Sequence, residues 1–277
     1  MLKADLHIHS TVSDGSETMA DIVRRAEQKG IGAVAFTEHD TLSHLPYLPR
    51  SGKVRVLGGV EISAMDPASR RRAHILGYNL QKPELVTAWV RPLLEARNRN
   101  SKKQVRVLQE NGLSIDPFAL RRAEGKYLYK QHIMDYLVAT GQAEELFGDF
   151  YRRVFKNQGI CDFDIEYLDA YEAVEVILRA GGRAVLAHGG QQQNFDMIPR
   201  LVERGLTGLE LNHPANSEAD KRILREYATR YGLFLTGGSD YHGRFQAGGH
   251  DVGAFLAEES GVQAVCGGMC TEGRDRE

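Results

Sequence analysis

Short apolar runs with the length of β-strands alternate with helical runs at the start of the chain, and this alternation limits the fold more than any other feature. Residues 3–8 and 33–37 have the pattern of strands, while residues 18–29 carry apolar side chains at helical spacing. Thr18 is a residue type that commonly begins helices, and Gly30 is one that commonly ends them. The segment therefore predicts two β-strands joined by an α-helix.

The alternation is interrupted between residues 83 and 182, where we find only helical patterns. They predict a long helix at 83–111 and shorter helices near Asp116, Gln131, Ala143 and Asp169. Outside this stretch, further strands are predicted at 55–60, 73–78, 184–187, 208–211 and 233–236, and further helices at 196–204 and 217–231. We therefore expect one α/β domain made of residues 1–82 and 183–277, with residues 83–182 as a helical insert that covers the active site.

Composition adds few constraints. The 277 residues include 35 basic and 37 acidic side chains, so no excess charge calls for a membrane or a stable nucleic-acid partner. No segment approaches the roughly 20 apolar residues that a membrane span needs. Three cysteines, an odd number without a secretory signal, favour the cytoplasm. Two of them, Cys266 and Cys270, near the end of a glycine-rich tail, are assigned no role.

Residue types that bind metals occur repeatedly beside the predicted strands. His7 and His9 alternate on one strand, so both side chains point to the same face, as two ligands of one metal must. Other such residues follow apolar runs, at the strand ends that meet at one mouth in parallel α/β folds. His74 is the exception because it begins its run. The candidate ligands are His7, His9, Asp14, His39, Glu61, His74, His188, Asp240 and His242.

These nine side chains offer nitrogen and oxygen atoms but no thiolate, a set that suits Mn, Fe, Zn or Co. They are too many for one ion, so we expect two or three divalent ions with Glu61 as a bridge. Such a cluster activates water and stabilises the charge that develops on a phosphoryl group. Hydrolysis of a phosphate ester is the favoured reaction, although a carbonyl substrate could use the same cluster.

Six motifs, ADLHIHSTVSDGS, AFTEHDT, GGVEIS, AHILGY, LAHGG and GGSDYHG, resemble the PHP (polymerase and histidinol phosphatase) family of metal-dependent phosphoesterases. The resemblance spans almost the whole chain and implies a distorted seven-stranded (β/α) barrel with a trinuclear centre, Mn being the leading metal and Fe or Zn the alternatives.

By analogy, the ligands divide into three sets around three ions. The first is His7, His9, Glu61 and Asp240, the second Glu61, His74 and His188, and the third Asp14, His39 and His242. A hydroxide between the first two ions would be the nucleophile. Glu61 and Asp240 thus take part in catalysis.

Two further segments resemble the substrate-binding segments of relatives that act on nucleotides and small metabolites. LYKQHIMDYLV contains Lys130 and His132, and LELNHPANS contains His213. Lys130 stands where those relatives have an arginine, and Ala215 and Asn216 replace a basic pair. We expect Lys130, His132 and His213 to bind the substrate, and His213 also to protonate the leaving alcohol.

The loss of basic residues favours a small phosphorylated metabolite over a nucleotide. Some family members that this chain resembles hydrolyse small cyclic phosphodiesters of sugar phosphates and then the resulting monoester. The resemblance therefore implies a cyclic sugar phosphodiester, such as 5-phosphoribose 1,2-cyclic phosphate, as the candidate substrate. One alternative is a 3′,5′-nucleotide bisphosphatase or a 5′ exonuclease of short RNA. The alternative from another class is a non-catalytic metal-binding module, although such modules usually have gaps in the ligand set and this sequence has none.

Overall fold

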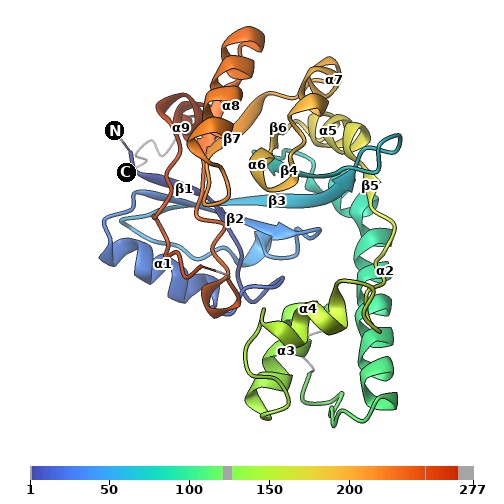
Figure 1. The fold of residues 1–277 in the computed structure, drawn as a ribbon. Helices are drawn as coiled ribbons and strands as arrows, with labels where there is room; N and C mark the ends of the chain where they lie inside the picture. Colours follow the sequence, from blue (N-terminus) through green and yellow to red (C-terminus); the bar gives the residue numbers. More distant parts are fainter. Residues whose placement is uncertain (1, 121–126, 247, 268–277) are drawn as a thin grey trace.

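A computed structural model describes residues 2–120, 127–246 and 248–267, and its centre is a nearly closed barrel of seven strands (Figure 1). In hydrogen-bonded order the strands are β1 (Ala4–Ile8), β2 (Ala33–His39), β3 (Arg55–Met65), β4 (Arg72–Tyr78), β6 (Arg183–Leu186), β7 (Gly208–Asn212) and β8 (Phe234–Gly237). Between β1 and the chain after β8, Ile8 forms a bridge with Tyr241, and the His9 amide donates to the Tyr241 carbonyl at 2.9 Å. The predicted seven-stranded barrel is confirmed.

Strand direction explains the unusual position of His74. β4 runs antiparallel to both β3 and β6, while the other strand pairs along the barrel are parallel. The start of β4 therefore lies at the same mouth as the ends of the parallel strands. His74, the third residue of β4, pairs with Ser63 near the end of β3. A ligand at the start of its strand thus reaches the same place as the others.

Helices surround the barrel: α1 (Met19–Gln28), α5 (Ala170–Arg179), α6 (Gly189–Gln192), α7 (Ile198–Glu203), α8 (Glu218–Tyr231) and α9 (Glu259–Cys266), with short 3₁₀ turns at Leu45–Tyr47, Phe195–Met197 and Gly243–Phe245. Helix α1 begins as its sequence predicts, because the Thr18 hydroxyl accepts the Asp21 amide at 3.2 Å. Its Ile22 and Ala26 are buried against the barrel strands, and Gly30 follows with a φ of +66°.

The segment predicted as an insert contains two packing environments. Helix α3 (Lys130–Ala139), helix α4 (Asp149–Phe155) and the second half of α2 (Pro83–Glu110) share a small hydrophobic core, and Figure 1 shows them beside the barrel. Val86 and Val90 of α2, together with α5, belong instead to the main core with the barrel strands. The domain limits at residues 83 and 182 stay a prediction.

Several element boundaries differ from the prediction. β3 continues to Met65. The prediction ended the strand at Val60 because the polar residues Glu61 and Ser63 interrupt the apolar pattern beyond that point. A two-residue strand, β5 (Leu168–Asp169), pairs with the end of β3 and is too short to show a period. Around Asp116 and Ala143 the described residues form turns where helices were predicted, and α4 starts later, at Asp149.

The cysteines and the helices add two observations. Cys161 and Cys266 are buried free thiols, while Cys270 lies outside the described residues. Within the described ranges, no helix is both long and apolar enough to cross a membrane.

Gly238 lies where β8 approaches β1 most closely. A Cβ atom at this position would stand 2.4 Å from the His7 amide nitrogen and 2.8 Å from its Cα, and backbone cannot move aside. We predict that Gly238→Ala lowers the free energy of unfolding by about 1–3 kcal/mol. Gly52→Ala is the matched control, because a Cβ there meets no atom within 4 Å. Chemical denaturation of the metal-free variants measures the difference, and equal stability would contradict this packing.

Candidate metal centre

All nine predicted ligands lie at one mouth of the barrel. They come from strands β1, β2, β3 and β4, from the loop after β1, and from the segments after β6 and β8. Most of these side chains are buried, and His7, His9, Glu61 and His188 are each no more than 1% exposed. The barrel thus gathers residues from both ends of the sequence, as the prediction required. Their role as ligands stays a prediction that the geometry below supports.

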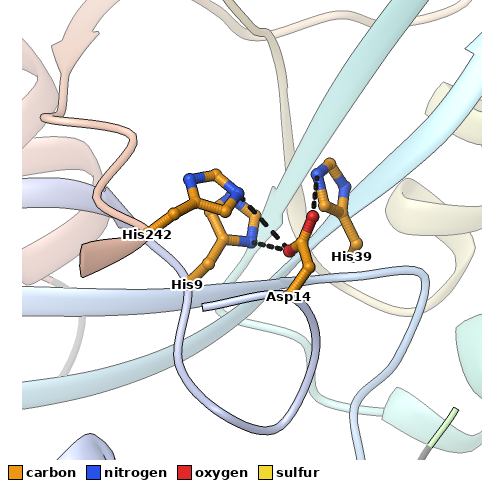
Figure 2. A group of neighbouring side chains, drawn as sticks. All are labelled: His9, Asp14, His39 and His242. Atoms are coloured by element: carbon orange, nitrogen blue, oxygen red, sulfur yellow. Dashed lines mark ion pairs between the residues drawn. The ribbon is translucent and has the colours of Figure 1, made fainter. Parts of the chain in front are cut away.

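One cluster consists of His9, Asp14, His39 and His242, which we call the Asp14 group (Figure 2). Asp14 lies at its centre. One carboxylate oxygen is 3.8 Å from His9 Nδ1 and 3.4 Å from His242 Nε2, and the other is 3.8 Å from His39 Nε2. Three imidazoles facing one carboxylate from three separate segments are a suitable ligand set for one divalent ion.

Glu61 connects the remaining histidines. Its Oε2 lies 3.3 Å from His7 Nε2, 3.2 Å from His9 Nε2 and 3.1 Å from His39 Nδ1. Its Oε1 lies 2.6 Å from His74 Nδ1 and 2.8 Å from His188 Nε2. The two oxygens of one carboxylate therefore face different sets of nitrogens. Each oxygen could therefore belong to a different candidate ligand set.

Asp240 completes the cluster on the β1 side. Its Oδ1 is 3.4 Å from His7 Nε2 and 3.2 Å from His9 Nε2, and these residues group with Glu61 as a second candidate ion site. His39, Glu61 and His74 form a third such group. The second group has the same members as the first set implied by the family resemblance, and the Asp14 group contains the third set together with His9. The third group shares Glu61 and His74 with the implied second set but contains His39 and not His188. A fourth group consists of His7, Glu210 and His213.

Buried atoms without hydrogen-bond partners show that these residues fit metal ions. Such atoms in the described part of the chain include both ring nitrogens of His9, His7 Nε2, Asp14 Oδ1, Glu61 Oε2 and Asp240 Oδ1. A buried polar atom without a partner is costly, and so many at one point are rare in proteins. Metal ions would satisfy these nitrogen and oxygen atoms together.

The charges of this cluster shift several pKa values. Burial alone would raise the pKa of Glu61, but the charges of His39, His74 and His7 hold it well below its usual range. Burial would lower the pKa of His9, yet the nearby carboxylates of Asp240 and Glu61 favour its protonated form and raise the pKa to about 10. For His39, burial prevails over nearby carboxylates and lowers the pKa to about 4. The carboxylates are thus ready to bind cations, while His9 must first lose a proton.

Two of the predicted ligand residues have a strained backbone. His188 has a φ of +27° and Asp240 has a φ of +47°. Both values lie in the left-handed region, which residues other than glycine rarely adopt. Strain of this kind persists only where the surrounding structure holds it, and it concentrates at functional sites. The two turns direct the His188 and Asp240 side chains into the mouth.

Buried carboxylates hold the histidines in place, and the sequence analysis missed them. Glu210 Oε1 lies 2.9 Å from His7 Nδ1, and its Oε2 accepts the His188 amide at 2.8 Å. Glu38 accepts bonds from the amides and hydroxyls of Ser10 and Ser13, and so shapes the loop that carries Asp14. Carboxylates behind metal-binding histidines fix the orientation of the ring. The available signal was a carboxylate inside an apolar strand, as in GLELN.

The predicted substrate-binding residues lie in different surroundings. His213 lines a cavity of about 380 Å³ beside Asp240 and His242. Lys130 is half-buried, and its charge interacts with Asp164. His132 is 3% exposed, and its Nδ1 accepts the Tyr129 amide while its ring contacts Phe245. Of the three, only His213 is among the described residues that line this cavity, and the binding roles of all three stay predictions.

Buried histidines and carboxylates grouped at the mouth of an α/β barrel define a metal-dependent hydrolase. The PHP domain family matches residues 5–247. The chain therefore belongs to the PHP domain family.

Relatives of known activity agree with this class. A phosphoribosyl 1,2-cyclic phosphate 1,2-diphosphodiesterase from Eggerthella lenta is 44% identical over 87% of this chain and 94% of its own length. A 3′,5′-nucleoside bisphosphate phosphatase from Chromobacterium violaceum is 28% identical over 91% of each chain. The crystal structure of a proposed metal-dependent phosphoesterase from Bifidobacterium adolescentis superposes with a TM-score of 0.86 at 26% identity, over 98% of both chains. This chain is accordingly a metal-dependent phosphoesterase.

The raised pKa of His9 makes metal binding dependent on pH. Its pKa rises from 6.5 to about 10 in the folded metal-free protein, so the protonated form contributes stability below pH 6.5 that is lost toward pH 10. A metal ion takes the place of this proton and therefore binds more tightly as the pH rises. We predict that stabilisation by Mn²⁺, measured as the difference in Tm with and without metal, grows between about pH 6 and about pH 9. A constant difference would contradict this account of His9.

Proposed function

We propose that the protein hydrolyses a small cyclic sugar phosphodiester, of the type 5-phosphoribose 1,2-cyclic phosphate, and then the monoester that results. The observation that carries the proposal is the 44% identity to the Eggerthella lenta diesterase, and the cavity beside Asp240 suits the sugar of such a substrate. The described residues that line this cavity include Gln131, Gln191 and Gln246 but no lysine or arginine. Neutral amides suit the hydroxyls of a sugar.

Identity to the relatives supports the same substrate. The Eggerthella lenta diesterase is 44% identical to this chain, against 28% for the bisphosphate phosphatase. The replacement of a basic pair by Ala215 and Asn216 has a structural counterpart, because Ala215 lines the cavity and the Asn216 side chain binds backbone. Asn216 Nδ2 donates to the Glu210 carbonyl at 3.0 Å. Asn216 thus stabilises the loop and does not extend toward an anion.

Two or three divalent ions, Mn²⁺ being the leading candidate, would be held by the Asp14 group, by His7, His9, Glu61 and Asp240, and by Glu61 with His74 and His188. When bound, such ions lower the pKa of water and neutralise charge on the phosphoryl oxygens. Glu61 would contribute to two of these sites. We also place the protein in the cytoplasm.

His213 is positioned to donate a proton. Its Nδ1 accepts the Ala215 amide at 3.0 Å, so the neutral ring carries its proton on Nε2. Nε2 lies 3.3 Å from Asp240 Oδ2 at the edge of the cavity. A substrate oxygen that enters this cavity can take the Nε2 proton in place of Asp240. In the imidazolium form, in which Nδ1 no longer accepts the Ala215 amide, His213 would protonate the leaving oxygen as the ester bond breaks and return to the neutral ring.

The substrate proposal predicts a preference among phosphate esters. The Mn-loaded protein should open the cyclic ester of 5-phosphoribose 1,2-cyclic phosphate and then release phosphate from the resulting monoester. Both steps together should be much faster than release of phosphate from adenosine 3′,5′-bisphosphate or of nucleotides from short RNA. A coupled phosphate assay with the three substrates side by side measures this preference. Faster turnover of the bisphosphate or the RNA would overturn the proposal in favour of the nucleotide alternative, and no turnover of any phosphate ester would favour the non-catalytic module.

The role of His213 predicts a specific loss. His213→Ala should lower kcat by about 100-fold or more, the usual contribution of a general acid, while the bound metal stays unchanged. His44→Ala is a useful comparison, because His44 is also a buried histidine near β2 but lies outside the cavity lining. Metal analysis and steady-state kinetics measure both variants. Unchanged turnover in His213→Ala would remove this residue from the mechanism.

A further inference from the structure

The helical insert contacts the Asp14 group through residues that have no predicted role. Tyr129 precedes α3, and Gln131 is in its first turn. The Gln131 side-chain amide donates to Asp14 Oδ2 at 2.8 Å, and the Tyr129 hydroxyl donates to the His39 carbonyl at 3.0 Å. The insert thus touches two of the four residues in this group directly.

A buried ion pair connects α2 to the same strands. Arg97 Nη2 lies 2.7 Å from Asp40 Oδ2 and 2.8 Å from the Ser63 hydroxyl. Asp40 directly follows the ligand His39, is fully buried, and has a strained φ of +55°. Its other oxygen accepts the Ser63 amide at 2.7 Å, two residues beyond Glu61. Arg97 therefore ties the ends of β2 and β3 to the insert.

The loop after β8 is also held. Arg244, two residues beyond the ligand His242, forms an ion pair with Asp135 of α3 at 2.8 Å, and Phe245 contacts His132. The insert therefore binds the three segments that carry Asp14, His39 and His242. These segments come from distant parts of the sequence. The Asp14 group forms only when all three segments bring their side chains to the same point (Figure 2).

We propose that Arg97, Tyr129 and Gln131 are positioning residues through which the docked insert holds Asp14 and His39, and so sets the metal affinity of the Asp14 group. The inference rests on the proposed function only in assigning an ion to this group. The bond from Gln131 leaves Asp14 Oδ1 directed toward His9 and His242. The bond from Tyr129 fixes the backbone from which His39 projects. Hydrogen-bonded groups behind metal ligands commonly control affinity in this way.

Three substitutions remove these contacts with little change of shape: Gln131→Met, Tyr129→Phe and Arg97→Met. Each has a matched control whose bonds lie within the insert. Gln142→Met, the control for Gln131→Met, removes hydrogen bonds to Ser114. Tyr136→Phe, the control for Tyr129→Phe, removes a hydrogen bond from the Asp116 amide. Arg152→Met, the control for Arg97→Met, removes an ion pair with Asp149. Arg97→Lys keeps the charge opposite Asp40. The controls separate the stability of the insert from its contact with the metal centre.

Titration of chelator-treated protein with Mn²⁺, followed by calorimetry and by the electron paramagnetic resonance of free Mn²⁺, measures each affinity without a substrate. The three variants should weaken one class of bound ion by roughly 10–100-fold, while the controls and Arg97→Lys stay near wild type. Excess Mn²⁺ should restore kcat in Tyr129→Phe. Unchanged affinity in Tyr129→Phe and Gln131→Met, or equal weakening in their controls, would overturn the inference. Because the titration does not use ester hydrolysis, an incorrect substrate assignment does not affect it.

Discussion

The Glu61 carboxylate is the interaction on which the rest of the site depends. One oxygen faces His7, His9 and His39, and the other faces His74 and His188. A group this buried and this crowded by imidazoles is stable only with compensating charge. The barrel provides this compensating charge because parallel and antiparallel strands carry their histidines to the same mouth. Residues as far apart in the sequence as His7 and His242 meet there.

Support for this centre extends outward in two directions. Toward the barrel, Glu210 and Glu38 fix the ring of His7 and the loop of Asp14. Toward the insert, Gln131 and Tyr129 hold Asp14 and the backbone of His39. The ligands are thus enclosed by groups of defined geometry on both sides, and the cavity beside His213 and Asp240 stays open to a substrate.

Much of this could be predicted from sequence, for physical reasons that differ between residues. His7 and His9 were predicted because alternation along a strand places both on one face. His74 could be placed only once β4 was known to be antiparallel, a tertiary property with no local signal. The contacts of Gln131, Arg97 and Glu210 join residues 117, 57 and 203 positions from their partners, so no pattern of neighbours reports them. Lys130 and His132 were predicted to bind the substrate because their segment resembles one in the relatives. In the structure, their neighbours Tyr129 and Gln131 contact the residues of the candidate metal centre.

The most direct test of the central claim is a crystal structure of the Mn-loaded protein with anomalous scattering data at the Mn edge. The account predicts Mn peaks at the barrel mouth, with the two oxygens of Glu61 bound to different ions and one further ion among His9, Asp14, His39 and His242. A single ion held by Glu61 through both oxygens, or Mn peaks away from this mouth, would contradict it.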